Sequence, residues 1–187
     1  NSILQLIQAL PTLHQSNAIV MDIGSTKREI TSALNELPSQ FDPIGVHPMC
    51  GKENLTIFNA DPLMFQNAPF AITPLKRTTE KAYNIASQIA TVIGANELLI
   101  DAETHDRWTA ATSHLPFLLS LTLALSTPEE VSPLVGPGFR STVRLAGTPK
   151  SMMIDILRTN SDEILERCHS YISTLTNLSE LIESSEF

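Results

Sequence analysis

Short apolar runs alternate with amphipathic stretches over the first hundred residues. Four apolar runs have the length of buried strands and cover residues 18–21, 44–46, 68–73 and 97–100. In three further segments the apolar residues recur every three or four positions, which predicts helices over residues 2–10, 27–37 and 76–93. Strands and helices that alternate in this way predict an α/β arrangement, a sheet with helices packed on it.

The pattern changes at Asp101, after which the chain is predicted to be all-helical. Asp101 is placed to cap a helix over residues 102–126, which its internal proline kinks. Shorter helical stretches follow, and a last helix is predicted over residues 149–184. We therefore expect two domains, an α/β domain over residues 1–100 and an all-helical domain over residues 101–187.

The last predicted helix carries a long apolar stripe. Its apolar residues recur every three or four positions from Ile156 to Ile182. One small helical domain has too little surface to cover this stripe, so we expect a second copy of the chain to cover it, as in a homodimer.

Composition and charge narrow the function classes. The 187 residues carry a formal net charge of -8, with 42% hydrophobic and 17% charged residues. The chain shows no basic stripe, so no nucleic-acid partner is expected. No apolar run reaches the roughly 18 residues of a membrane span, and no charged region precedes the first helix, so we expect neither a membrane segment nor a signal peptide. The two cysteines and five histidines lack metal-ligand spacings, which favours a metal-free protein of the reducing cytoplasm.

A histidine stands at the end of the second predicted strand. The apolar run over residues 44–46 ends at His47, and Pro48 prevents the strand from continuing. This places an imidazole that titrates near neutral pH at the edge of the sheet where open α/β sheets carry their chemistry.

The first predicted strand also ends in polar residues. It leads through Asp22 and Gly24 to Ser25, at the start of the following helix. Backbone N–H groups and a hydroxyl at a helix N-terminus suit an anion or a polar ligand. The simpler interpretation is that Ser25 caps the helix.

The helical half holds two further groups of polar residues. His105, Trp108 and Thr112 share one helical face, with Asp106 and His114 nearby, and either a ligand or a structural hydrogen-bond network would explain them. Arg140 and Arg144 are four residues apart, so both would project from one face of a helix. Such a pair suits a carboxylate or phosphate, and surface ion pairing is the alternative.

Five motifs, in order and spacing, resemble the prephenate/arogenate dehydrogenase family of tyrosine biosynthesis. They are DIGSTK from Asp22, GVHPMCG from Gly45, the pair His105-Asp106, SHLP from Ser113 and GFRSTVRLA from Gly138. The resemblance covers nearly the whole chain. It implies the carboxyl-terminal half of a Rossmann-type sheet followed by a helical dimerisation domain. It also implies NAD(P)-dependent oxidative decarboxylation of prephenate or arogenate.

The same resemblance implies roles for individual residues. His47 matches the catalytic histidine, which accepts the proton of the ring hydroxyl, and Ser25 matches the serine that hydrogen-bonds the same hydroxyl. Arg144 matches the arginine that binds a substrate carboxylate, while Arg140 and His114 line the same substrate pocket. The residues of the first turn, Asp22, Gly24 and Ser25, would lie against the cofactor, NAD or NADP.

Three residues depart from the family pattern: Phe117, Ser141 and Met153 stand where the family commonly has histidine, an acid and tryptophan. These departures lie at the side-chain end of the substrate and leave the choice between prephenate and arogenate open.

The GxGxxG turn of a dinucleotide-binding domain does not occur in this sequence. We therefore expect the chain to bind dinucleotide poorly by itself and to be either part of a longer enzyme or a truncated product. A non-catalytic remnant that dimerises or binds a carboxylate is the alternative. A β-hydroxyacid-type or imine-reducing dehydrogenase fits less well, because those enzymes use a lysine or aspartate on a helix and not a histidine at a strand end.

Overall fold

The computed structural model describes residues 2–51, 58 and 60–185. The chain divides into two compact units, Asn1–Asp106 and Arg107–Phe187. The division falls inside helix α4 (Ala102–Thr109), whereas the sequence pattern placed it just before that helix. The first unit is α/β and the second is all-helical, so the predicted fold class is confirmed.

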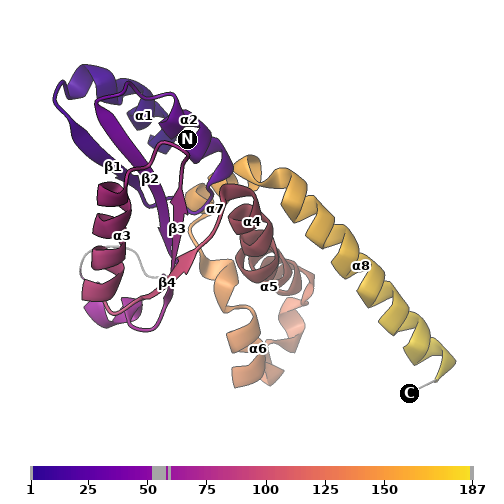
Figure 1. Cartoon of the computed structure of the whole chain (residues 1–187). Coiled ribbons are helices and arrows are strands. Elements are labelled where there is room, and N and C mark those ends of the chain that lie inside the picture. Colours follow the sequence, from indigo (N-terminus) through magenta and orange to yellow (C-terminus); the bar gives the residue numbers. More distant parts are fainter. Residues whose placement is uncertain (1, 52–57, 59, 186–187) are drawn as a thin grey trace. The chain divides into compact units, whose positions relative to one another are not determined.

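A four-stranded mixed sheet forms the centre of the first unit (Figure 1). Its strands are β1 (Ala18–Asp22), β2 (Phe41–Pro48), β3 (Pro69–Pro74) and β4 (Asn96–Leu99), hydrogen-bonded in the order β1-β2-β3-β4. The pairs β1–β2 and β3–β4 are parallel, and β2–β3 is antiparallel. The four predicted strands are therefore present, and β2 extends through Pro48, one residue past the predicted stop.

Helices cover both faces of the sheet because side chains alternate along the strands. In β1, Ile19 and Met21 pack towards helix α3 (Glu80–Val92), with Ile44 and Val46 of β2. The residues between them face the other side, where α1 (Ser2–Leu13) and α2 (Arg28–Asn35) pack. His47 has the same parity as Phe41, which belongs to the α1–α2 core, so its side chain leaves the sheet on that face.

Helix boundaries differ from the sequence pattern where side chains intervene. Helix α1 continues through Pro11 to Leu13, beyond the predicted end. Helix α3 begins at Glu80 and not at residue 76, because the Thr79 hydroxyl accepts a hydrogen bond from the Ala82 N–H and caps it. On α3 the buried stripe consists of Ala82, Ala86 and Ala90, whereas Ile89, which lies at the same apolar spacing, is 40% exposed.

The second unit is built from helices and single turns. They are η3 (Ala110–His114, a π-helical turn), α5 (Leu115–Ser126), η4 (Glu129–Leu134), α6 (Pro137–Thr142), η5 (Arg144–Gly147), α7 (Lys150–Thr159) and α8 (Ser161–Ser184). Its core contains Ala110, Phe117, Met153, Ile156 and Ile164. The π-helical turn interrupts the predicted helix over 102–126 just before Pro116.

The predicted helix over residues 149–184 is in fact two helices. Asn160 separates α7 from α8 with φ -138° and ψ 30°, which is not a helical conformation. The Asn160 side chain is fully buried, and its Nδ2 lies 3.2 Å from Nδ1 of His114. This buried polar contact fixes the break, which the continuous apolar periodicity concealed.

The run Ala102–Ser126 is, among the described residues, long and apolar enough to cross a membrane by length and composition. Core helices of soluble proteins pass the same test. Within this run His105, Asp106 and His114 are buried in hydrogen-bonded contacts and Phe117 belongs to the helical core. The run is therefore weak evidence for a membrane segment.

Candidate functional site

His47 lies near the carboxyl end of β2, on the α2 side of the sheet, and is partly exposed. Its Nδ1 lies 3.0 Å from Nε2 of His105, with the two rings tilted by 58° and their centroids 5.2 Å apart. This distance is that of a direct hydrogen bond between the two imidazoles.

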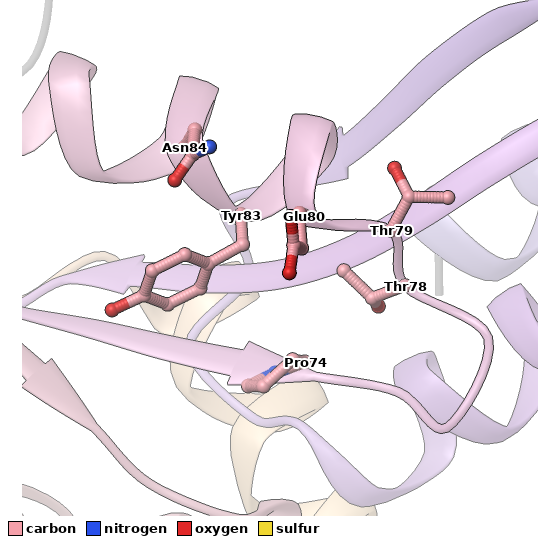
Figure 2. A pocket seen from close by; sticks show the side chains of 6 residues that line it. All are labelled: Pro74, Thr78, Thr79, Glu80, Tyr83 and Asn84. Carbon is pink, nitrogen blue, oxygen red and sulfur yellow. The ribbon is translucent and has the colours of Figure 1, made fainter.

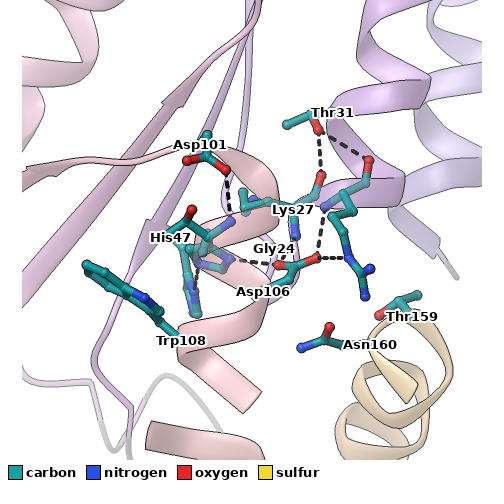
Figure 3. Close-up of polar contacts among 12 residues, drawn as sticks. Gly24, Lys27, Thr31, His47, Asp101, Asp106, Trp108, Thr159 and Asn160 are labelled. Carbon is teal, nitrogen blue, oxygen red and sulfur yellow. Dashed lines mark hydrogen bonds and ion pairs between the residues drawn. The ribbon is translucent and has the colours of Figure 1, made fainter. Parts of the chain in front are cut away.

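His105 and Asp106 reach this position from the first turns of α4. That helix begins at Asp101, whose Oδ1 accepts a hydrogen bond from Thr104 N at 2.8 Å, as the sequence predicts. His105 is 2% exposed, and its Nδ1 lies 2.8 Å from Oδ1 of Asp106, which is fully buried. The three side chains of His47, His105 and Asp106 thus form one hydrogen-bonded chain. Figure 3 shows the two ends of this chain, His47 and Asp106.

The Asp106 carboxylate also fills the N-terminus of α2. Its Oδ1 accepts from Lys27 N at 2.7 Å, and its Oδ2 accepts from Arg28 N at 2.9 Å. Burial alone would raise the pKa of Asp106, but the hydrogen bonds from His105 and from these two N–H groups lower that pKa below its usual value. The favoured interpretation that Ser25 caps this helix is wrong, since Lys27 is the N-cap residue and the capping oxygens come from Asp106.

A buried ion pair lies in the turn that joins β1 to α2. Lys27 Nζ donates to Asp22 Oδ2, and both side chains are almost inaccessible to solvent. Burial raises the pKa of Asp22 and lowers that of Lys27, against the attraction between the two charges. The same Oδ2 accepts from Gly24 N at 2.8 Å, whereas the Asp22 Oδ1 is buried and has no hydrogen bond to any described residue.

The predicted cofactor residues Asp22, Gly24 and Ser25 lie at the end of β1 and in the turn that leads into α2. A Cβ added to Gly24 would lie 2.7 Å from Ile30 Cδ1 and 2.9 Å from Ile3 Cδ1, so this glycine makes room for packing side chains. The α2 N-terminus, which could have bound a phosphate, holds Asp106 instead. The α2 N-terminus is therefore not available to a phosphate group.

The three predicted substrate residues lie in the helical unit. His114 is 1% exposed in the π-helical turn, where it contacts Asn160. Arg140 and Arg144 are both exposed. The prediction that they share one helix is wrong, because α6 ends at Thr142 and Arg144 belongs to the separate turn η5. The Ser120 hydroxyl holds that turn by accepting a hydrogen bond from Ala146 N at 2.9 Å.

The sequence pattern singled out His105 and Asp106 without assigning them a contact. The expected polar stripe does not act as a unit, because His105 is buried while Trp108 is 51% exposed and Thr112 is also exposed. Lys27 was missed altogether. The available signal was a histidine and an aspartate, adjacent in sequence, near the start of an apolar helix, a pair that needs buried partners.

A separate pocket lies at the N-terminus of α3 (Figure 2). It has a volume of about 350 Å³ and is lined by Pro74, Thr78, Thr79, Glu80, Tyr83 and Asn84. No predicted site residue lines it. Its polar groups serve the fold, since Thr79 caps α3, and the Thr78 hydroxyl both donates to Pro43 O and accepts from Leu75 N.

Two family models match the chain from end to end. Residues 1–99 match "Prephenate dehydrogenase, nucleotide-binding domain", and residues 101–187 match "Prephenate dehydrogenase, dimerization domain". The first of these alone covers more than half of the chain.

Individual proteins agree with the family models. The prephenate dehydrogenase of Bacillus subtilis is 29% identical over 175 residues, which are 90% of this chain and 47% of that protein. The cyclohexadienyl dehydrogenase of Zymomonas mobilis is 27% identical over 179 residues, which are 92% of this chain and 61% of that protein. The chain spans about half the length of the first curated relatives it matches.

Solved structures share the fold over the whole chain. Prephenate dehydrogenase from Aquifex aeolicus, in complex with hydroxyphenyl propionate and NAD+, superposes with a TM-score of 0.86 at 25% identity, over 99% of this chain and 67% of that one. Synechocystis arogenate dehydrogenase gives a TM-score of 0.77 at 27% identity, over 100% of this chain and 68% of that one. The mixed sheet is thus Rossmann-like, as in these solved structures, and the chain belongs to the prephenate dehydrogenase family.

Proposed function

We propose that this chain is part of an NAD(P)-dependent dehydrogenase that oxidatively decarboxylates prephenate or arogenate. The observation that carries the proposal is the partly exposed His47, hydrogen-bonded to His105 at the end of β2, in a chain of this family. An imidazole held in this way suits a general base that accepts a proton from a substrate hydroxyl.

In the proposed reaction His47 accepts the proton of the ring hydroxyl as the ring carbinol is oxidised to a carbonyl. NAD(P) supplies the oxidising chemistry, since it accepts the hydride from the carbinol carbon. The ring then loses its carboxylate as CO2, and the electron pair of the broken bond aromatises the ring and leaves a phenolate. His47 returns its proton to that oxygen, so the histidine ends the cycle as it began and no net proton is released.

The remaining site residues keep the roles that the resemblance implies. In this proposal Ser25 hydrogen-bonds the reacting hydroxyl, and Arg144 binds a substrate carboxylate, with Arg140 and His114 in the same pocket. The exposure of both arginines supports a role in binding an anion from solvent. Asp22, Gly24 and Ser25 would shape the cofactor side of the turn, and Asp22 would do so through Lys27 and Gly24 N.

We further propose a homodimer through α8. Every residue from His169 to Ser184 is exposed in the single chain, including Ile172, Leu175, Leu178 and Ile182. A row of leucine and isoleucine in water favours association, and the matching family model describes a dimerisation domain.

Light scattering at micromolar concentration tests the dimer. Leu175→Lys places a charge on the apolar face and should shift the mass to that of a monomer. Asn177→Lys, on the opposite face of α8, adds the same charge and should leave the dimer intact. A monomeric mass for the unaltered protein, or equal effects of the two substitutions, would contradict a dimer through this face.

The proposed domain organisation follows the family models, an α/β domain over residues 1–100 and a helical domain over residues 101–187. The proposed setting is the cytoplasm, with a small-molecule substrate and neither a nucleic-acid nor a membrane partner.

Turnover is the direct test of the function. Prephenate and arogenate should each be assayed with NAD and with NADP, using this chain and the protein encoded by the complete open reading frame. Reduction of NAD(P), together with release of CO2, by the complete protein would establish the reaction, and the preferred pair would name the substrate and cofactor.

A second candidate, a non-catalytic remnant, is favoured by one observation. Among the described residues, the α2 N-terminus cannot bind a cofactor phosphate, because Asp106 fills it. Absence of turnover with all four pairs, combined with measurable binding of a dicarboxylate in calorimetry, would support the remnant over the enzyme.

A further inference from the structure

We propose that His105 and Asp106 are positioning residues that hold His47 in the tautomer whose Nε2 acts as the base. The catalytic part of this proposal rests on the proposed function, whereas the tautomer itself does not. The evidence is which atom must donate and which must accept in the two hydrogen bonds that link Asp106 to His105 and His105 to His47.

The direction is set at Asp106. Its Oδ1 accepts from Lys27 N, and its Oδ2 accepts from Arg28 N, so both oxygens act as acceptors. An ionised carboxylate has no proton to donate, so the contact of 2.8 Å to His105 requires that Nδ1 of His105 carries the hydrogen.

The same argument fixes the position of the proton on His47. A neutral His105 with a proton on Nδ1 has a lone pair on Nε2, which lies 3.0 Å from Nδ1 of His47. His47 must therefore donate from Nδ1, and its lone pair stands on Nε2. His47 is partly exposed and His105 is 2% exposed, so the base is the ring that a substrate can reach and the ring behind it is shielded from water.

The chain of contacts also stabilises the protonated form. When Nε2 of His47 accepts a proton, the positive charge can be shared with His105 across the bond between the rings, and His105 is in contact with the Asp106 carboxylate. Among the described residues, Asp22, Lys27 and Arg28 are further charged groups near this pair.

The carboxylate links this base to the turn that carries Ser25. Asp106 caps α2, and α2 directly follows that turn, so one side chain fixes the backbone beside Ser25 and the ring behind His47. Two groups proposed to act on one hydroxyl thus share a common support.

The test compares two replacements of His105 in the protein encoded by the complete open reading frame. His105→Gln offers an amide oxygen that can accept from His47 Nδ1, whereas His105→Phe fills the buried volume and accepts nothing. We expect His105→Phe to lower kcat on the order of 10²-fold with KM changed less than about threefold, and His105→Gln to recover about tenfold of that loss. If His105 only filled the buried volume, phenylalanine would be the better substitute and the order of the two variants would be reversed.

Nitrogen-15 NMR of histidine-labelled protein reads the tautomer without any turnover. The unaltered protein should show His47 protonated on Nδ1, and His105→Phe should abolish that preference. His14→Phe and His14→Gln are the matched controls, because His14 is exposed and directly follows α1. They should change neither kcat nor the His47 signals.

Two results would overturn the proposal: a His47 protonated on Nε2 in the unaltered protein, or a His105→Phe enzyme with normal kcat. If the unaltered protein turned over no substrate, the proposed function would fail, and the NMR tautomer would still decide whether His105 orients His47.

Discussion

Replacing Asp106 by asparagine should destabilise the first unit by an amount that depends on pH. Both carboxylate oxygens accept hydrogen bonds, Oδ1 from His105 Nδ1 and Lys27 N, and Oδ2 from Arg28 N. An asparagine has one oxygen and one NH2 group, so in either orientation the NH2 group must face a donor. The better orientation keeps the oxygen towards His105 and leaves the N–H of Arg28 without its acceptor.

The magnitude follows from two losses. A buried backbone N–H that loses its acceptor costs about 1–3 kcal/mol. The loss of a negative charge at a helix N-terminus adds about 0.3–1 kcal/mol. We therefore expect Asp106→Asn to lower the free energy of unfolding by about 1–4 kcal/mol at pH 7, which for a chain of this length corresponds to roughly 3–12 °C in Tm.

The pH dependence has a definite sign. Burial raises the pKa of Asp106 in the folded protein, but its hydrogen bonds lower that pKa by more, so the net shift is downwards. The ionised form therefore stabilises the fold. This contribution is fully present above the unfolded pKa of about 3.9 and is lost as the pH falls through the folded value. A protonated aspartate presents one donor and one acceptor, as asparagine does. The difference between the two proteins should therefore narrow below about pH 4.

Urea unfolding at several pH values measures this difference. Asp101→Asn is the matched control, because Asp101 is an exposed cap of α4 and asparagine caps a helix as well as aspartate does. It should cost less than about 0.5 kcal/mol. The reasoning is refuted if Asp106→Asn costs no more than this control, or if the difference at pH 7 persists unchanged at pH 3.

Three further substitutions test the rest of the structure. Lys27→Met leaves the Asp22 carboxylate buried without its cation and should lower the free energy of unfolding by about 3–5 kcal/mol. The double variant with Asp22→Asn should restore most of that loss, and a double variant as unstable as the single one would contradict this account. Arg77→Met removes the guanidinium group that donates to the carbonyls of Asn35, Leu37, Pro38 and Phe41. Urea unfolding should show that the free energy of unfolding falls by about 2–4 kcal/mol, whereas Lys76→Met, at the neighbouring exposed position, should lower it by less than about 0.5 kcal/mol. Asn160→Ala removes a buried partner of His114 and should lower the free energy of unfolding by about 1–3 kcal/mol, whereas the exposed Asn177→Ala should not; equal effects would show that the contact at the α7–α8 break contributes nothing.

Local pattern was sufficient for the sheet. The strand boundaries were predicted to within one or two residues, except that β2 begins at Phe41, three residues before the predicted run, because each strand contains an apolar run bounded by polar or turn residues. The Asp101 cap was predicted for the same reason, since a cap contacts the residue three positions along.

Contacts between distant residues explain what the pattern missed. The cap of α2 comes from Asp106, 79 positions after Lys27, so nothing near Ser25 in the sequence could reveal it. The break at Asn160 depends on His114, 46 positions earlier, while the apolar period continues through it from Ile156 to Ile164. In both cases a buried polar side chain overrode a correct local signal.

The charges around His105 give the buried network one further property. Asp22, Lys27 and Asp106 are ionisable residues that are less than a tenth exposed. The charges of the Asp22–Lys27 pair sum to zero whether both groups are ionised or both are neutral, so Asp106 contributes the remaining negative charge. Arg28 approaches Asp106 at 3.5 Å, but its side chain is 26% exposed and shares its charge with solvent. A proton shared by His47 and His105 would therefore balance the buried carboxylate, so the protonated state formed during the proposed reaction is the one that this network can hold at lowest electrostatic cost.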